Sequence, residues 1–174
     1  AVESIMHQKV SFGIRVVVAD DSSNDLTLKI IRQYADLHPE ITFTVLPEMA
    51  RLGVTKNYQR GFSACSAEYV AVLEGDDYWC SPYKLALQVQ YLVDHPECAM
   101  CGCNYYILDE ANRTFTLRVH QLEGASVYDT SMIIRDNVVS NFSTSIYRRK
   151  VLNRIPQELF DLVGILVRSD TASR

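Results

Sequence analysis

The carboxylates Glu74, Asp76 and Asp77, all within four residues, form the stretch of this chain best suited to chemistry. They directly follow the apolar run 69–73, whose aromatic and β-branched residues are typical of a short buried strand. Carboxylates this close repel one another, and a hard divalent cation such as Mg²⁺ or Mn²⁺, which prefers oxygen ligands, removes that conflict. The alternative interpretation is a solvated acidic turn ahead of a helix that opens at Pro82.

A second acidic pair, Asp20 and Asp21, follows another apolar run at 14–19. Strands that alternate with helices predict an α/β fold, with a mostly parallel sheet flanked by helices. Ligands of such sheets bind beyond the carboxyl ends of the strands. Two acidic strand ends therefore suit the binding of a nucleoside diphosphate. One carboxylate would contact its base or ribose, and the other would bind its diphosphate through a metal. Lys56 could contact the base or a phosphate as a point charge.

The hydrophobic pattern predicts an ordered series of elements along one domain. Predicted strands cover 14–19, 41–46, 69–73, 98–108, 115–120 and 142–147, and predicted helices cover 1–8, 26–38, 53–67, 82–94 and 129–138. No capping residue precedes the first helix and no strand leads into it, so we expect the chain to begin part-way through a domain. That domain is predicted over 1–160, incomplete at its front, and 161–174 is predicted to be an uncertain or disordered tail.

Composition narrows the function classes. The net charge of −4 and the lack of a Lys/Arg cluster argue against nucleic-acid binding, and no apolar run approaches the ~20 residues that span a bilayer. The five cysteines, an odd number, indicate a reducing compartment. Cys98, Cys101 and Cys103 could suggest zinc, but a strand would divide their side chains between two faces, which favours buried free thiols. The basic run 148–150 is interpreted as a solvated helix start rather than a contact with an anionic membrane.

Several segments together carry a family resemblance. They are Val17 to Thr27 with Asp20-Asp21-Ser22-Ser23-Asn24-Asp25, Leu52 to Asn57 with Gly61, Glu74-Gly75-Asp76-Asp77-Tyr78-Trp79 with Pro82, Lys84 and Leu85, His95-Pro96, Asn104-Tyr105-Tyr106, and Ser143 to Arg149. In this order and spacing they resemble the inverting family 2 glycosyltransferases of the GT-A fold. The match is to the subgroup with Tyr-Trp after the paired aspartates, and the similarity covers about residues 1–160.

The resemblance implies roles for the donor-binding residues. Asp21 would bind the edge of uracil or another base, and Asp20 would support its loop. Lys56 would also approach the base, and Asp76 would lie near the ribose or the diphosphate.

The resemblance also implies a metal, Mn²⁺ or Mg²⁺. Asp77 would be its ligand, with Glu74 assisting through water, and the metal would stabilise the departing nucleoside diphosphate as a Lewis acid. The residue type of Trp79 allows two interpretations. Its ring could stack on a sugar on the donor or acceptor side, or it could pack beneath the loop.

The function implied is metal-dependent transfer of a sugar, with inversion, from a nucleotide-diphosphate donor to a hydroxyl of a glycan or lipid-linked acceptor. We expect a UDP-sugar, a role in cell-envelope polysaccharide biosynthesis, and a cytoplasmic location that allows peripheral association with the inner face of the membrane. The family's general base is an Asp or Glu shortly after a segment like 156–162. No carboxylate follows Gly164 at that place, and Asp161 and Asp170 lack its context, so no base is assigned. The alternatives are a nucleotide-sugar-binding fragment without turnover and, third, a nucleotidyltransferase.

Overall fold

The computed structural model describes residues 1–118, 124–129, 131–132, 141–158 and 160. The chain divides into two compact units, which are described separately. The N-terminal unit comprises residues 9–70 and the chain from Tyr147 onward, together with Val2, and the central unit comprises Ala1, residues 3–8 and residues 71–146. The predicted tail 161–174 and most of the predicted helix 129–138 lie outside the described residues.

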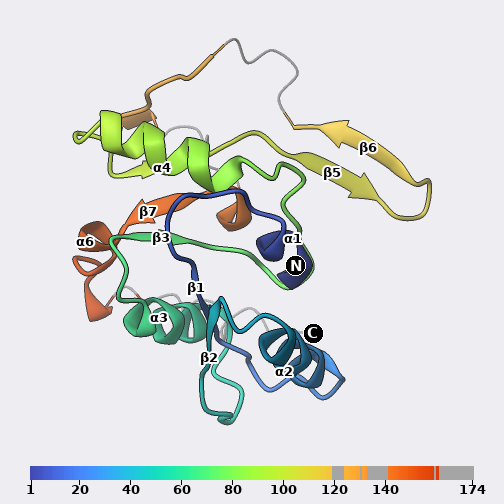
Figure 1. Cartoon of the computed structure of the whole chain (residues 1–174). Helices are drawn as coiled ribbons and strands as arrows, with labels where there is room; N and C mark the ends of the chain where they lie inside the picture. Colours follow the sequence, from blue (N-terminus) through green and yellow to red (C-terminus); the bar gives the residue numbers. More distant parts are fainter. Residues whose placement is uncertain (119–123, 130, 133–140, 159, 161–174) are drawn as a thin grey trace, which may run out of the picture. The chain divides into compact units, whose positions relative to one another are not determined.

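The N-terminal unit is built on a parallel pair of strands (Figure 1). Strand β1, Arg15–Val18, is followed by helix α2, Thr27–Leu37, and by strand β2, Thr42–Val45. The two strands are parallel in register from Arg15 opposite Thr42 to Val18 opposite Val45. Parallel neighbours need a crossover connection, and α2 supplies it. These elements confirm the α/β pattern predicted from the hydrophobic periodicity.

Helix α3, Val54–Ala64, packs closely against the end of β1. A Cβ atom at Gly61 would lie 3.4 Å from Cβ of Ala19, at the near limit of ordinary van der Waals contact, which leaves no room for a longer side chain in that direction. Glycine is disfavoured inside a helix by up to about 1 kcal/mol relative to alanine, and this close approach to β1 explains its presence. Gly53, the N-cap of α3, has φ of +83°, a conformation that L-residues rarely adopt.

A second sheet contains strands β3, Tyr69–Ala71, β7, Ile146–Arg148, and β4, Met100–Cys101. Their order across the sheet is β3-β7-β4. Both acidic segments of the sequence thus follow short strands, Asp20 and Asp21 after β1 and the Glu74–Asp77 segment after β3.

Arg148 corrects the interpretation of the basic run as solvated. It is 7% exposed, its guanidinium carbon lies 5.5 Å from the ring centre of Tyr69, and its Nη1 donates to the Tyr69 hydroxyl at 3.3 Å. Aromatic faces attract guanidinium groups, which allows this cation to be buried. Only the next residues begin a helix, α6, Arg149–Leu152.

The central unit is organised by helix α4, Lys84–Asp94, which begins two residues after Pro82 and ends before Pro96, as predicted. Its buried residues are Lys84, Leu85, Gln88 and Leu92. Two of these four are polar, which is unusual for a core-facing side of a helix. The short helix α1, Val2–Met6, lies at the start of the chain.

The strand predicted over 98–108 is wrong, because the structure divides this segment. Strand β4 ends at Cys101, and strand β5, Tyr106–Asp109, pairs instead with β6, Thr114–Leu117, in an antiparallel hairpin (Figure 1). Between β4 and β5, the side chain of Asn104 accepts a hydrogen bond from the backbone N–H of Tyr105. Such local bonds by Asn compete with ladder pairing.

The strand predicted over 142–147 is also partly wrong. Residues Phe142–Thr144 form a 3₁₀ turn, η1, and β7 begins only at Ile146. The Asn141 side chain accepts from the backbone N–H of Ser143 at 2.6 Å, which favours the turn over a strand.

All five cysteines are free thiols. Burial raises the pKa of both Cys65 and Cys101, so these thiols stay protonated at neutral pH. Within the described residues, no cluster of three or more His, Cys, Asp or Glu side chains could hold a metal ion, and no helix has the length and apolar character to cross a membrane.

Candidate donor-binding and metal site

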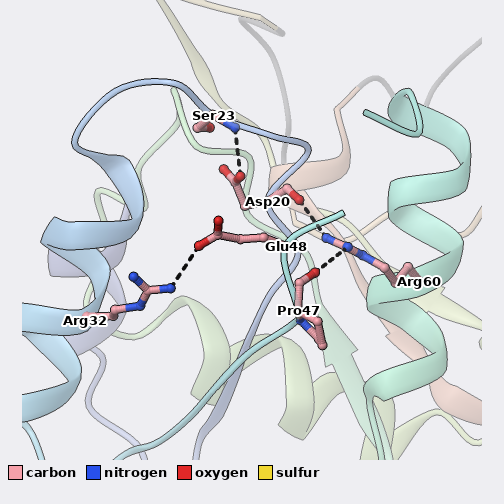
Figure 2. A network of polar contacts seen from close by, with 6 residues as sticks. All are labelled: Asp20, Ser23, Arg32, Pro47, Glu48 and Arg60. Carbon is pink, nitrogen blue, oxygen red and sulfur yellow. Dashed lines mark hydrogen bonds and ion pairs between the residues drawn. The ribbon is translucent and has the colours of Figure 1, made fainter. Parts of the chain in front are cut away.

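The loop after β1 is held by contacts to its backbone and by its own side chains. The Asp20 carboxylate accepts from the backbone N–H of Ser23 at 2.8 Å, which folds the loop back on itself. Arg60 of α3 donates through Nη2 to the Asp20 carbonyl at 2.6 Å and through Nη1 to the Pro47 carbonyl at 3.0 Å (Figure 2). One guanidinium thereby ties the loop after β1 to the loop after β2. The fork of donors on Arg suits this double contact.

The Asp21 carboxylate joins the same loop to the start of α3. Its Oδ1 accepts from the backbone N–H of Leu52 at 2.7 Å, and its Oδ2 accepts from the backbone N–H of Gly53 at 3.0 Å. The positive end of the α3 dipole favours a carboxylate there. Each carboxylate oxygen has a second lone pair, so Asp21 can still accept from a ligand while holding α3.

Two further side chains of α3 face the same loop. Asn57 donates to the Ala19 carbonyl at 2.6 Å. Its Oδ1 and the Nε of Arg60 are buried without a hydrogen-bond partner among the described residues. Lys56, predicted to approach the base, is exposed in the first turn of the helix. The sequence pattern contained Asn57 within a family segment but gave no sign that Arg60 fixes two loops.

Glu48, in the loop after β2, forms an ion pair with Arg32 of α2 at 3.1 Å (Figure 2). The two side chains are 65% and 59% exposed, so the pair contributes little to stability.

In the central unit, the acidic segment forms a closed turn. The backbone N–H of Asp77 donates to the Glu74 carbonyl at 3.2 Å. The backbone N–H of Glu74 donates to Oγ of Ser143 at 2.9 Å, and Nδ2 of Asn141 donates to Oδ2 of Asp77 at 3.3 Å. Asp76 is exposed and Asp77 is half-buried. The segment around η1 therefore contacts both ends of the acidic turn.

Trp79 is anchored beneath this turn. Its indole N–H donates to the Ser143 carbonyl at 2.7 Å, and its backbone N–H donates to Oγ of Ser4 at 3.1 Å. The ammonium of Lys84 lies 4.5 Å from the centre of its ring. Its polar edge is bonded and a cation lies against its ring, contacts that suit packing beneath the loop, while a contact of Trp79 with a sugar stays a prediction.

Lys84 is a buried cation that the sequence pattern did not reveal. It is 7% exposed, and its Nζ donates to Oε1 of Gln88 at 2.7 Å. Burial lowers the pKa of Lys84 to about 8. Gln88 in turn donates through Nε2 to the carbonyls of Cys101 and Thr144, at 3.1 and 2.9 Å. A side-chain network thus links α4, β4 and the segment around η1.

Gln8 plays a similar part at the start of α4. Its Oε1 accepts from the backbone N–H of Leu85 at 3.1 Å, and its Nε2 donates to the Ser81 carbonyl at 2.8 Å. The first contact satisfies one of the N–H groups at the helix start that have no partner within the helix, and the second adds a donor to the Ser81 carbonyl, which also accepts from the backbone N–H of Lys84. The sequence gave no sign of Gln8, because the residues it contacts are far away along the chain.

The structure divides the predicted site residues between the units. Asp20, Asp21 and Lys56 belong to the N-terminal unit, and Glu74, Asp76, Asp77 and Trp79 belong to the central unit. That the two acidic clusters meet at one edge of a sheet remains a prediction.

Comparison with known proteins identifies the class. Residues 1–156 match the family described as Glycosyl transferase family 2, and the chain belongs to this family. Its fold is that of a mannosyltransferase, PcManGT from Pyrobaculum calidifontis, solved in complex with GDP-Man and Mn²⁺. The TM-score is 0.60 at 20% sequence identity, over 88% of this chain and 41% of that one.

The chain is also similar to curated proteins over part of its length. An uncharacterised protein of Mycobacterium tuberculosis is 41% identical over 101 residues, which is 58% of this chain and 29% of that protein. The amylovoran biosynthesis glycosyltransferase AmsE of Erwinia amylovora is 27% identical over 108 residues, 62% of this chain and 39% of the relative. A putative teichuronic acid biosynthesis glycosyltransferase, TuaG of Bacillus subtilis, is 26% identical over 117 residues, 67% and 44% of the two chains. The chain thus spans less than half the length of these relatives.

Proposed function

We propose that this chain carries the donor-binding part of an enzyme that transfers a sugar from a nucleoside-diphosphate donor to a hydroxyl acceptor, with a divalent cation. The observation that carries the proposal is the closed acidic turn Glu74–Asp77 after β3, held at both ends by the segment around η1. Separate buried or half-buried partners fix the carboxylate and the backbone of this turn. A turn that is only solvated has no need of such partners.

The donor set fits Mn²⁺ or Mg²⁺. Asp77 offers carboxylate oxygens, one of which accepts from Asn141, and Asp76 is exposed beside it. Such cations are commonly bound through one or two carboxylates plus substrate phosphates and water, so a complete cage of protein ligands is not expected. A bound cation would supply Lewis-acid stabilisation of the departing diphosphate. Asp77 would be its protein ligand, and Glu74 would assist through water.

The nucleoside would be held by residues of the N-terminal unit. Asp21 has lone pairs left after its two backbone contacts and would accept from a base N–H. Asp20 shapes the loop, and Lys56 would contact the base or a phosphate. Asp76 would lie near the ribose or diphosphate. A UDP-sugar is the expected donor, and the GDP-Man of the structural relative makes GDP-sugars the second class to test.

The reaction proposed is a single displacement with inversion. The acceptor oxygen attacks the anomeric carbon as the bond from that carbon to the diphosphate oxygen breaks, and the hydroxyl proton passes to a general base. Asp161 and Asp170 lie outside the described residues, and no base is assigned. Relatives named for amylovoran and teichuronic acid biosynthesis support a glycan acceptor. A lipid-linked acceptor, met at the cytoplasmic face of the membrane, is the other acceptor proposed.

Isothermal titration with UDP and with GDP, in Mn²⁺ and in EDTA, tests the proposal. We expect nucleotide binding that strengthens at least tenfold with Mn²⁺ and a loss of that gain in Asp77→Ala. Asp94→Ala is the matched control, because Asp94 is an exposed carboxylate at the end of α4 that accepts from Gln90. Binding that does not respond to Mn²⁺, or that responds equally in Asp77→Ala, would refute the metal site. Release of sugar from UDP- or GDP-sugars would distinguish turnover from binding alone.

A further inference from the structure

We propose that Asn141 is a positioning residue, which orients the Asp77 carboxylate for the divalent cation. The inference rests on the proposed function and goes beyond it, because it assigns a role to a residue far away in the sequence. Its starting point is the contact from Nδ2 of Asn141 to Oδ2 of Asp77 at 3.3 Å, across 64 positions of the chain.

The contact uses one carboxylate oxygen and fixes the direction of the other. An Asp carboxylate on an exposed turn rotates freely about its terminal torsion, which has only broad minima. A donor on Oδ2 restricts that rotation and leaves Oδ1 for the cation. Hydrogen-bond partners of a ligating carboxylate orient it for the metal, and their loss commonly weakens metal binding.

Asn141 is itself held in place by the turn that follows it. Its Oδ1 accepts from the backbone N–H of Ser143 at 2.6 Å, so its amide orientation is set with the NH₂ group toward Asp77. The backbone carbonyl of Asn141 accepts from Oγ1 of Thr144 at 2.7 Å and from Oγ of Ser145 at 3.3 Å. Both of these residues are buried, Thr144 8% and Ser145 0% exposed. The donor that reaches Asp77 is thus fixed to the interior of the central unit.

The same segment fixes the other end of the acidic turn. Oγ of Ser143 accepts from the backbone N–H of Glu74, while the Ser143 carbonyl accepts from the indole of Trp79. Ser143 itself is 5% exposed, so its half of both contacts lies in the interior of the central unit. Asn141 contacts the carboxylate of Asp77, which is predicted to bind the metal, so its substitution should affect metal affinity directly.

Substitution of Asn141 by Ser separates the two roles of the side chain. Serine keeps an acceptor for the Ser143 N–H, since Ser and Asn cap helical turns about equally well, but it is too short to donate to Asp77. Asn112→Ser is the matched control, because Nδ2 of Asn112 also donates to an Asp carboxylate, Oδ2 of Asp109 at 2.7 Å, in the β5–β6 turn.

Affinity for Mn²⁺ is measured on the full 174-residue chain, by electron paramagnetic resonance of free Mn²⁺ at saturating UDP, and again with GDP. We expect Asn141→Ser to bind Mn²⁺ about tenfold more weakly. Nucleotide affinity in EDTA and the thermal midpoint without metal should stay close to those of Asn112→Ser. If Asn141 had a purely structural role, its substitution would change these two quantities as well. Asn112→Ser should bind Mn²⁺ as the unaltered chain does.

The outcomes separate the two proposals. If the unaltered chain takes up no Mn²⁺ with either nucleotide, the proposed function and this inference both fail. If it does and Asn141→Ser binds equally tightly, the inference alone fails. Asn141→Thr, another capping residue without the donor, is the second variant. Loss of the fold in both Asn141 variants would overturn the inference, because the residue would then be a structural cap.

Discussion

Replacement of Lys84 by methionine should remove a pH dependence of stability that this single side chain creates. Methionine keeps most of the length and the apolar character of the lysine stem and removes the ammonium. In the native chain Lys84 is 7% exposed, and its ammonium lies 2.7 Å from Oε1 of Gln88 and 4.5 Å from the ring centre of Trp79. The unfolded chain exposes it to water.

The magnitude follows from the pKa of Lys84, which burial lowers from 10.5 to about 8. At 1.36 kcal/mol for each pKa unit, this difference corresponds to about 3 kcal/mol in the free energy of unfolding. The Trp79 ring favours the charged form by roughly 0.5–2 kcal/mol and opposes the shift, so we expect about 1–3 kcal/mol.

The sign is fixed by proton uptake. Between pH 8 and 10.5 the unfolded chain keeps the Lys84 proton while the folded chain has released it. The unfolded state therefore binds more protons, and stability contributed by Lys84 rises with pH through this window. Burial also raises the pKa of Cys101 and Cys103, which gives the opposite slope in both proteins. The Lys84 charge lowers the pKa of both thiols, so its removal leaves them higher in the variant and adds to the difference in the same direction.

Urea unfolding of both proteins, followed by Trp79 fluorescence at steps from pH 7 to 10.5, measures the effect. Near neutral pH, Lys84→Met should lie within about 1–2 kcal/mol of the unaltered chain, because relief from burying a charge offsets the lost contacts and the unpaired Gln88 oxygen. The difference in unfolding free energy should then move by about 1–3 kcal/mol in favour of the lysine protein as pH rises. A difference that stays constant across this range would refute the burial of a titrating ammonium.

Two further predictions concern the loop after β1. Asp21→Ala should lower the unfolding free energy by about 2 kcal/mol without any nucleotide, because the N–H groups of Leu52 and Gly53 lose a charged acceptor. If the midpoint of urea unfolding is the same as that of the native chain, Asp21 serves ligands alone. Gly61→Leu should lower the unfolding free energy by about 1–3 kcal/mol, since even a Cβ there lies 3.4 Å from Ala19, and Gly61→Ala should lower it less. Equal thermal midpoints for the two variants would contradict the close packing of α3 on β1.

Much of the fold was predictable where local chemistry and tertiary structure agree. The strands at 15–18, 42–45 and 69–71 and the helices at 27–37, 54–64 and 84–94 lie within their predicted ranges, because apolar periodicity and proline positions act locally. The prediction for 98–108 was wrong because the apolar residues of this segment have the pattern of one continuous strand. Pairing partners divide it, with β5 joining β6 in a hairpin rather than extending β4.

The candidate site shows the same limit at the level of single residues. Asp20, Asp21, Asp76 and Asp77 were identifiable because acidic residues after buried strands are a local pattern. Asn141 was not, because nothing in its own neighbourhood indicates that its amide reaches a carboxylate 64 positions away.

What the sequence determined by itself was the alternation of strands and helices, the family of the chain and the two acidic segments that follow strands. Tertiary structure decided which partners those side chains meet. Lys84 and Arg148 look like ordinary surface cations in sequence, yet both are 7% exposed. The Arg148 guanidinium lies against the ring and the hydroxyl of Tyr69, 79 positions away, whereas Lys84 contacts Gln88 one turn further along α4 and the ring of Trp79. The energy of a buried charge depends on groups brought close by folding, and those groups leave no periodicity in the sequence.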